Sequence, residues 1–204
     1  MTKKTFNIII TGVGGQGLIT LASVFNEAAF NQGYDIKSSE LHGLSQRGGS
    51  VETHVRFGKR ACTVGSRSVS CGVFSPLISG GEADLIIGLE ILEGLRATKY
   101  ASQKTKFLIN NYSLPFPGSL NKEEIEKNLK KIAKNKLYLV SASDICQKEL
   151  NNEVVSGIYL LGYGVFKKLI PLKPESIVKG IEKNIPAKYL ELNKKAFELS
   201  KTND

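Results

Sequence analysis

The chain has 204 residues, of which 41% are hydrophobic and 23% are charged. This composition excludes disordered, collagenous and coiled-coil chains, and no apolar run approaches the roughly 18 residues that would span a bilayer. The net charge of +9 favours anionic partners. However, the lysines are mixed with glutamates, and no nucleic-acid-binding motif is present. With no signal-peptide pattern at the N-terminus, we expect a cytoplasmic protein that binds neither nucleic acid nor membranes.

The three cysteines, Cys62, Cys71 and Cys146, form no CxxC motif and no regularly spaced set. An odd number of cysteines in a reducing compartment argues against a disulfide framework. The spacing also argues against a zinc or iron–sulfur site built from this chain alone. Cys62 and Cys71 could meet across a hairpin, but two ordinary thiols are the preferred interpretation. We therefore expect no metal site in this chain.

The first forty residues alternate between strand and helix patterns. Phe6–Ile10 is a short, apolar, β-branched run, which is typical of a buried strand. The glycine turn Gly12–Gly17 follows, and apolar residues then recur at helical spacing from Leu18 until Gly33 ends the helix. Tyr34–Ser38 is the second strand, so this region predicts a βαβ unit.

The next segment, Glu40–Ser50, is polar and glycine-rich and fits no period, so it is expected to be a loop. Val51–Phe57 alternates apolar with polar residues, which predicts a half-buried strand with His54 on its exposed side. Arg60–Gly81 holds short strands or a hairpin, and Asp84–Glu90 is another buried strand.

The remaining elements follow from apolar periodicity and turn residues. We expect a helix, a strand, a proline-rich connection, a helix with a capping-box-like start, and a final strand. The first helix spans Ile91–Ala101 and the strand after it Lys106–Ile109. Leu114–Gly118 is the proline-rich connection, the second helix follows Asn121, and the final strand is Leu137–Val140. Val154–Ile170 is apolar on nearly all sides and carries three glycines, so it is expected to pack in the core or against a partner. Two more helical segments follow Pro171.

Strands alternate with helices over most of the chain. This order predicts an α/β fold, a Rossmann-like sandwich with a largely parallel sheet and C-terminal helices. We expect one domain over residues 1–204, with a helical C-terminal part from about residue 152. Ligands bind such sheets at the carboxyl ends of the strands, where Gly12–Gly17 and Glu40–Gly49 both fall.

The glycine turn is the first candidate binding site, with Gly12, Gly14, Gly15, Gln16 and Gly17 as its residues. Gly12 would allow the tight turn, Gly14 the approach of a ligand to the backbone, and Gly17 close helix packing. Free N–H groups at the helix start would then face a phosphate or carboxylate. An NAD site is disfavoured because no acidic residue ends the second strand at the usual place. A turn that only packs the helix on the sheet is the alternative.

The Glu40–Gly49 loop is the second candidate, because it is too long and too polar for a simple connection. Arg47 could clamp a phosphate or carboxylate, and His42 could move a proton near neutral pH. Alternatively, Glu40 and Arg47 pair and only stabilise the loop. The candidate ligand or active-site residues are Glu40, His42, Gln46, Arg47, Gly48 and Gly49. No nucleophile–base set is present, so we assign no catalytic residue.

Four motifs in this sequence resemble one family. They are Gly-Val-Gly-Gly-Gln-Gly-Leu at Gly12–Leu18, the loop motif at Ser39–Val51, Phe74-Ser-Pro-Leu-Ile78, and Ala83-Asp84-Leu85. Together they resemble the gamma-type subunit of 2-oxoacid:ferredoxin oxidoreductases, and most of all the beta subunit of the indolepyruvate enzymes. The similarity covers nearly the whole chain. The sequence departs from the family pattern at about Ala61–Gly72, which resembles an insertion.

The resemblance implies the CoA-dependent oxidative decarboxylation of a 2-oxoacid such as indolepyruvate. In that family thiamine diphosphate attacks the keto carbon, electrons pass through iron–sulfur clusters to ferredoxin, and the acyl group goes to CoA. This chain has neither a cysteine cluster nor the Gly-Asp-Gly segment of a thiamine diphosphate–Mg²⁺ site. We therefore expect a larger alpha-type subunit to carry these cofactors and to reach ferredoxin through the complex. The equivalent subunit for pyruvate, branched-chain 2-oxoacids or 2-oxoglutarate, and an independent dinucleotide-binding protein, are the alternatives.

Overall fold

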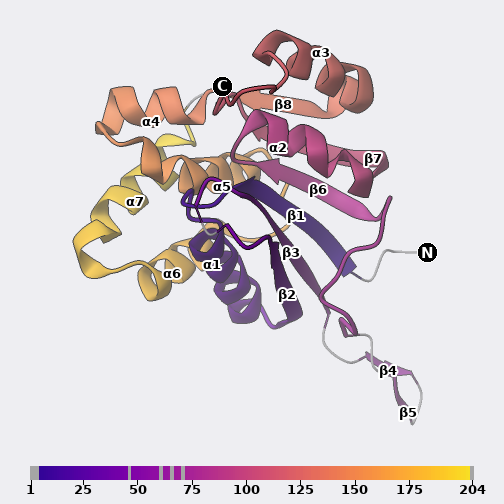
Figure 1. Cartoon of the computed structure of the whole chain (residues 1–204). Coiled ribbons are helices and arrows are strands. Elements are labelled where there is room, and N and C mark those ends of the chain that lie inside the picture. Colours follow the sequence, from indigo (N-terminus) through magenta and orange to yellow (C-terminus); the bar gives the residue numbers. More distant parts are fainter. Residues whose placement is uncertain (1–4, 46, 60–61, 65–66, 70–71, 203–204) are drawn as a thin grey trace.

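A six-stranded sheet forms the centre of the molecule, in the strand order β2-β3-β1-β6-β7-β8 (Figure 1). The computed structural model describes residues 5–45, 47–59, 62–64, 67–69 and 72–202. Each strand pairs with its neighbours in parallel except β3, which is antiparallel to both β1 and β2. The prediction of an α/β fold with a largely parallel sheet is therefore confirmed. The strands are β1 (Thr5–Val13), β2 (Tyr34–His42), β3 (Ser50–Lys59), β6 (Ala83–Gly88), β7 (Ala101–Asn110) and β8 (Leu137–Val140).

Helices cover both faces of this sheet and enclose two hydrophobic clusters. Because side chains alternate along a strand, Ile8 and Ile10 of β1 lie in one cluster and Ile9 lies in the other. The first cluster is covered by α1 (Leu18–Asn31), α4 (Ala142–Leu150), α5 (Ser156–Phe166), α6 (Pro174–Asn184) and α7 (Ala187–Leu199). The second is covered by α2 (Ile91–Arg96), the 3₁₀ helix η1 (Ala97–Tyr100) and α3 (Lys122–Ala133). In the described part of the chain, no helix combines the length and apolar character needed to cross a membrane.

The predicted βαβ unit at the N-terminus is present, but its two strands are not neighbours in the sheet. β1 and β2 run in the same direction, but β3 lies between them and is hydrogen-bonded to both. In the dinucleotide-binding fold the corresponding two strands are neighbours. The insertion of an antiparallel strand therefore changes the surroundings of the glycine turn.

Two predicted segments around this insertion differ in the structure. The sequence predicted a loop from Glu40, but β2 continues to His42. The strand is longer because Glu40 pairs with Thr53 of β3 and His42 pairs with Val51. His54 is only 1% exposed, whereas its polar neighbours on the strand predicted an exposed side chain. Residues 72–82 cover this face, and the backbone N–H of Ile78 donates to Nδ1 of His54 at 2.9 Å.

The C-terminal part also differs in detail. The predicted helix Val154–Ile170 is shorter, since a 3₁₀ turn (Glu153–Val155) precedes α5 and the helix ends at Phe166. Its burial was predicted correctly, because α5 packs in the first cluster. α4 comes before the predicted helical part and was missed.

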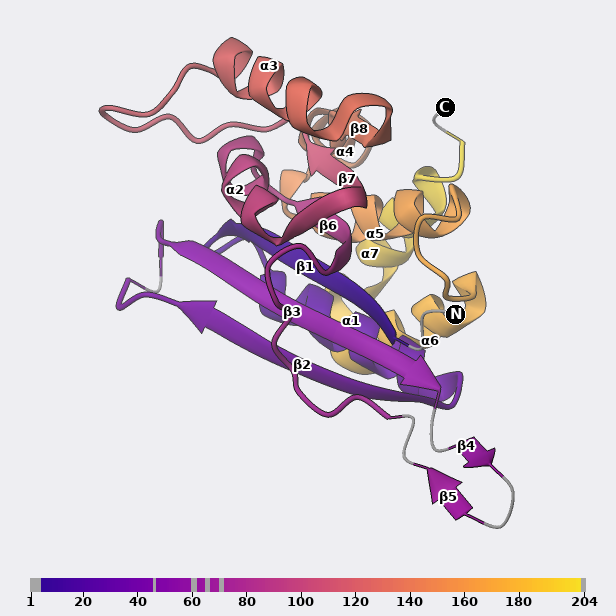
Figure 2. The same ribbon diagram turned by 90° about the vertical axis from the view of Figure 1, so that its right-hand side faces the viewer.

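A two-stranded hairpin, β4 (Cys62–Val64) and β5 (Arg67–Val69), lies away from the main sheet (Figure 2). It falls inside the segment Ala61–Gly72 that departs from the family pattern. Cys62 lies opposite Val69 in the hairpin register, and Cys71 is outside the described residues.

Candidate functional site

The glycine turn joins β1 to α1 through a backbone that only glycine adopts readily. Gly15 and Gly17 have φ angles of +108° and +78°, in the region that side chains with a Cβ disfavour. Gly12 is needed for space instead, since an added Cβ would lie 2.6 Å from Oε1 of Gln16 and 3.1 Å from Cβ of Leu89. The sequence analysis gave the tight turn to Gly12 and close packing to Gly17, and the structure reverses these two roles. Close packing is at Gly12, and the positive φ angles of the turn are at Gly15 and Gly17.

Gln16 folds back under the turn. Its Oε1 accepts the backbone N–H of Val13 at 2.8 Å, and its amide nitrogen lies 3.5 Å from the carbonyl oxygen of Leu89. The side chain therefore holds the turn in shape and ties it to the segment that follows β6.

The amino end of α1 is open. Its N-cap is Gly17, which has no side chain, so no side chain caps the first turn. The N–H groups of Leu18, Ile19 and Thr20 have no partner among the described residues. Unpaired N–H groups and the helix dipole together favour an anion at such a position.

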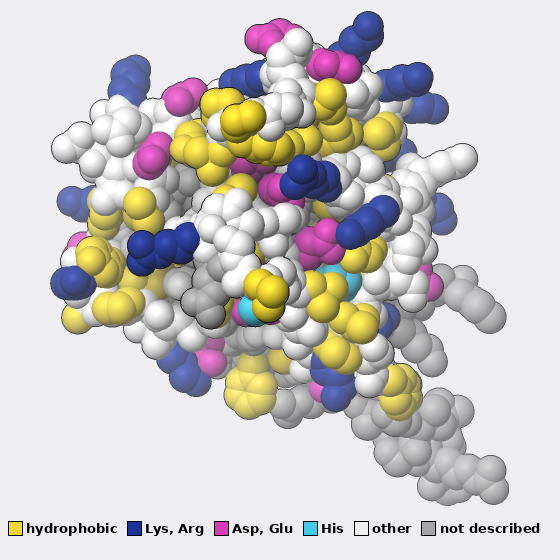
Figure 3. Space-filling model, viewed as in Figure 1, with side chains coloured by type: hydrophobic (Ala, Val, Ile, Leu, Met, Phe, Trp, Pro, Cys, Tyr) yellow, Lys and Arg dark blue, Asp and Glu magenta, His cyan; other side chains and the backbone are white. Residues whose placement is uncertain are grey.

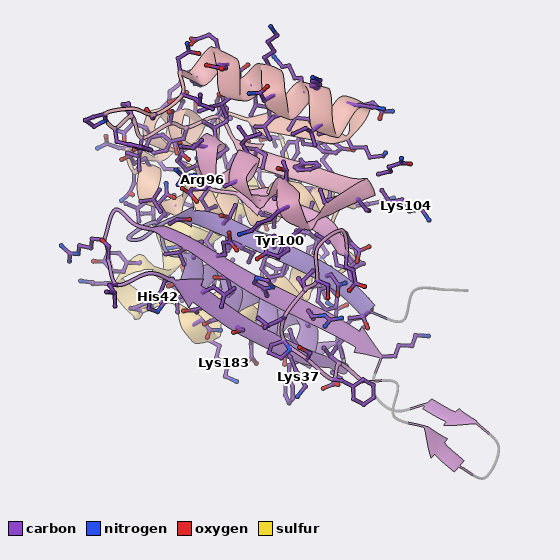
Figure 4. The ribbon with its side chains drawn as sticks, turned by 45° about the vertical axis from the view of Figure 1, so that its right-hand side comes forward. Lys37, His42, Arg96, Tyr100, Lys104 and Lys183 are labelled. Atoms are coloured by element: carbon purple, nitrogen blue, oxygen red, sulfur yellow. The ribbon has the colours of Figure 1, made fainter. Side chains whose placement is uncertain are left out.

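A cavity of about 500 Å³ lies beside this helix start. Thr20 forms part of its wall, and Glu40 and His42 from the end of β2 face it from the other side. Figure 4 shows His42 at this edge of the sheet, where its Nδ1 donates to the carbonyl oxygen of Gly43 at 2.9 Å. The full lining is Gly14, Gly15, Gly17, Leu18, Ile19, Thr20, Glu40, His42, Ser45 and Val51.

The glycine turn and the following loop are joined by their backbones. The N–H of Gly14 donates to the carbonyl oxygen of Gly49 at 2.8 Å, and the N–H of Gly48 donates to the carbonyl oxygen of Gly14 at 3.2 Å. An added Cβ on Gly49 would come within 2.8 Å of the carbonyl oxygen of Ser45. The two candidate sites of the sequence are therefore one structural unit.

Three other predicted loop residues, Arg47, Gly48 and Gly49, are not among those that line the cavity. Arg47 is exposed, and its side chain forms no ion pair with Glu40 or with any other described residue. Its backbone carbonyl accepts the hydroxyl of Ser45 at 2.7 Å. Gln46 lies outside the described residues. The alternative in which a Glu40–Arg47 pair stabilises the loop is therefore not what the structure shows.

A second cavity, of about 480 Å³, lies on the other side of the helix start. It shares Gly17 and Thr20 with the first cavity, but its walls are mostly apolar side chains from α1, α5 and α7, such as Leu21, Ile158 and Leu192. The amino end of α1 therefore lies between a cavity with a mixed polar and apolar lining and one with a mostly apolar lining.

Two carboxylates near this edge were missed by the sequence reasoning. Glu90 and Glu93 are only 2% and 4% exposed, and both lie at the start of α2. Burial raises the pKa of Glu90 above its ordinary value. The available signal was an acidic residue placed directly after a buried strand, with a second one three positions later, as in a capping box.

The described residues contain no group of three or more His, Cys, Asp or Glu side chains that could hold a metal ion. Cys146 is buried in the core, and burial raises the pKa of its thiol to about 12. A thiol with such a pKa stays protonated near neutral pH, whereas metal ligands are thiolates. Cys146 therefore does not fit an iron–sulfur site.

Comparisons with known proteins identify relatives along nearly the whole chain. Residues 7–202 match the family described as POR: Pyruvate ferredoxin/flavodoxin oxidoreductase. The chain is 31% identical to indolepyruvate oxidoreductase subunit IorB of Thermococcus kodakarensis, over 96% of this chain and 94% of the relative. It is 32% identical to the IorB subunit of Archaeoglobus fulgidus, over 95% and 92%. It is also 26% identical to the pyruvate/ketoisovalerate oxidoreductases common subunit gamma of Pyrococcus abyssi, over 91% and 89%.

Solved structures share the fold at lower sequence identity. Pyruvate oxidoreductase subunit PORC from Thermotoga maritima matches with a TM-score of 0.69 and 21% identity, over 98% of this chain and 96% of that one. The 2-oxoglutarate:ferredoxin oxidoreductase from Magnetococcus marinus, solved with 2-oxoglutarate, coenzyme A and succinyl-CoA bound, matches with a TM-score of 0.70 and 16% identity. There the match covers 98% of this chain but 31% of the longer one. These comparisons confirm the resemblance that the sequence motifs indicated.

Proposed function

The chain belongs to the pyruvate ferredoxin/flavodoxin oxidoreductase family, and we propose that it is one subunit of a cytoplasmic, CoA-dependent arylpyruvate:ferredoxin oxidoreductase. In this proposal the complex converts a 2-oxoacid such as indolepyruvate to an acyl-CoA, CO₂ and reduced ferredoxin. The subunit contributes assembly, closure of the active site and a binding site for an anionic ligand. A larger subunit contributes the redox cofactors.

The observation that carries the anion site is the open amino end of α1 in the wall of the 500 Å³ cavity. Its unpaired N–H groups suit a phosphate of CoA, which accepts hydrogen bonds and is stabilised by the positive end of the helix dipole. Glu40 lies in the same cavity and repels an anion, so we assign its carboxylate to a hydroxyl group of the ligand. Arg47 is exposed at the adjacent loop, and we propose that its guanidinium contacts the ligand when the complex closes.

The side chains that the structure describes do not fit the other cofactors of the family. An iron–sulfur cluster needs several thiolates, and the one cysteine with a described side chain, Cys146, is buried and protonated. No acidic cluster for the Mg²⁺ of thiamine diphosphate occurs among the described residues. We therefore assign thiamine diphosphate, Mg²⁺ and the iron–sulfur clusters to the larger subunit, and derive no chemical step in this one.

The choice of an arylpyruvate rests on the relatives. The chain is 30–32% identical to four proteins named as indolepyruvate oxidoreductase subunits and 25–26% identical to three named as pyruvate/ketoisovalerate oxidoreductase subunits. The complex of this chain with its larger subunit should therefore reduce ferredoxin faster with indolepyruvate than with pyruvate. A higher kcat/KM for pyruvate would contradict this substrate class while leaving the family unchanged.

The anion site is tested by placing a charge at the helix start. Thr20 is exposed and lines the cavity. A carboxylate here suits the helix dipole, so Thr20→Glu should fold normally, but it should repel a phosphate. We expect Thr20→Glu to raise the KM for CoA in the complex about tenfold, with little change in the KM for the 2-oxoacid.

Thr20→Gln is the matched control, because it has the same size without the charge. It should leave the KM for CoA near the wild-type value. Equal KM values for CoA in the Glu and Gln variants would refute the anion site at the start of α1.

A further inference from the structure

Two carboxylates at the start of α2 are buried, although neither takes part in the proposed anion site. Glu90 is 2% exposed and Glu93 is 4% exposed. Burying a carboxylate is costly unless it is paired or hydrogen-bonded. The contacts of each one therefore show what its burial accomplishes.

Glu90 serves α2 and the loop that follows β7. Its Oε2 accepts the backbone N–H of Glu93 at 2.8 Å, which caps α2, and its Oε1 accepts the N–H of Leu114 at 3.3 Å. Both partners are backbone N–H groups, one in α2 and one in the loop that follows β7. Glu90 therefore explains the local structure around α2 and requires no further role.

Glu93 reaches in a different direction. One of its carboxylate oxygens accepts the hydroxyl of Ser50, and the other lies 2.7 Å from a guanidinium nitrogen of Arg96. Ser50 is the first residue of β3 and lies 43 positions earlier in the chain than Glu93. The Arg96 side chain is half exposed, and it lies on α2 at the same edge of the sheet as His42 (Figure 4). Figure 3 shows Lys or Arg and Asp or Glu side chains close together below a band of hydrophobic side chains in the upper half of the molecule.

Ser50 directly follows Gly48 and Gly49, whose backbones bond to Gly14 in the glycine turn. Ser50 lies opposite Val13 in the β1–β3 ladder, and its contact with Glu93 adds a side-chain restraint on the C-terminal side of the two glycines. The pairing with Gly14 restrains the glycines directly. Two consecutive glycines have the greatest backbone freedom in a loop, so ordering them costs the most conformational entropy.

We propose that Glu93 is a positioning residue, which holds Ser50 and thereby keeps Gly48 and Gly49 paired with Gly14 beside the cavity. Arg96 holds the carboxylate in place and balances its charge. That the Glu93–Ser50 contact also affects ligand binding rests on the proposed function. That it keeps the glycine backbones paired does not. The competing explanation is that Glu93 only stabilises α2.

Amide hydrogen exchange of the isolated full-length chain tests the positioning directly. Ser50 is exposed, so Ser50→Ala should fold normally while it removes the hydroxyl that Glu93 holds. We expect exchange at the amides of Gly14 and Gly48 to become about tenfold faster, the factor implied by loss of a hydrogen bond to a charged group. Amides of the β7–β8 ladder should keep their wild-type rates.

Ser50→Thr keeps a hydroxyl and should restore slow exchange at both glycines. Ser38→Ala is the matched control, since it removes another exposed serine that bonds one side chain, Asn26, at 2.8 Å. It should leave the two glycine amides unchanged. If Ser50→Ala also leaves them unchanged, or if all amides change together, the positioning role is wrong.

The second readout uses the complex with the larger subunit. Ser50→Ala and Glu93→Gln should raise the KM for CoA and leave kcat near the wild-type value, and Ser50→Thr should not. Faster exchange at Gly14 and Gly48 with an unchanged KM for CoA would uphold the positioning role and contradict the proposed ligand. The two proposals can thus fail separately.

Discussion

Arg47 carries an exposed guanidinium in a loop with glycines on its C-terminal side, and neither Glu40 nor another described acidic side chain pairs with it. If it contacts an anionic ligand in the complex, its planar fork should matter as well as its charge. We expect Arg47→Lys to assemble and melt like the wild type, but to raise the KM for CoA or for the 2-oxoacid, or to lower kcat. Glu40→Gln serves as the comparison for stability. Normal kinetics in an intact Arg47→Lys complex would rule out the ligand role.

His54 makes the stability of the fold depend on pH. Burial lowers its pKa below the ordinary value of 6.5, and the nearby Lys99 and Arg56 act in the same direction, against Glu52. The unfolded chain therefore takes up a proton first as the pH falls, so stability is complete above pH 6.5 and declines below it. Protonation of Nδ1 would also remove the acceptor for the N–H of Ile78.

His54→Asn offers an acceptor oxygen close to the position of Nδ1 but does not titrate in this range. Urea unfolding between pH 5.5 and 7.5 should show the loss of stability at the acidic end for the wild type and a flatter profile for His54→Asn. The same slope in both proteins would show that another group is responsible.

The packing of α5 against α7 depends on Gly162. A methyl group there would overlap the hydroxyl of Ser200 and come within 2.9 Å of the carbonyl oxygen of Phe197. Ser200 is 2% exposed and its hydroxyl bonds the same carbonyl at 2.6 Å, so neither atom can move away cheaply. We expect Gly162→Ala to lower the free energy of unfolding by about 1–3 kcal/mol, measured by denaturant unfolding.

Gly43→Ala is the control for this substitution, because nothing lies within 4 Å of the added Cβ and the φ angle is not positive. It should unfold at nearly the same denaturant concentration as the wild type. A Gly162→Ala variant as stable as the control would mean that the two helices separate without cost.

Elements with a strong local signal were predictable from the sequence. β8 has the predicted bounds Leu137–Val140, and the helix after Asn121 is capped as expected, with the N–H of Glu124 donating to Oδ1 of Asn121 at 2.8 Å. In both cases the residues that define the element lie within a few positions of each other. The start of α1 directly after Gly17 was predictable for the same reason.

Features set by distant parts of the chain were not predictable. No residue near β1 or β2 indicates that β3 lies between them, because strand order is decided by tertiary pairing. His54 is buried by residues 72–82, which come about twenty positions later in the sequence. The link from Glu93 to Ser50 was hidden for the same reason, whereas the approach of the glycine turn to the following loop was predicted from the shared sheet edge.

At the scale of the whole molecule, the question is which cofactors the residues of this chain could bind. The glycine turn resembles a dinucleotide site in sequence, but the insertion of β3 between β1 and β2 changes the geometry in which such a site is built. The described residues also contain no group of three or more His, Cys, Asp or Glu side chains that could hold a metal ion. In the proposed function, the redox chemistry belongs to the larger subunit.

We therefore expect the isolated chain to be colourless and inactive. It should show no iron–sulfur absorbance, should reduce neither ferredoxin nor NAD with any 2-oxoacid, and should not bind NAD in a calorimetric titration. The complex with the larger subunit, purified and assayed in the same way, is the positive control and should be coloured and active with CoA present. Reduction of NAD by the isolated chain would favour an independent dinucleotide-binding protein. Reduction of ferredoxin by the isolated chain would instead show that its own residues hold the cofactors here assigned to the partner.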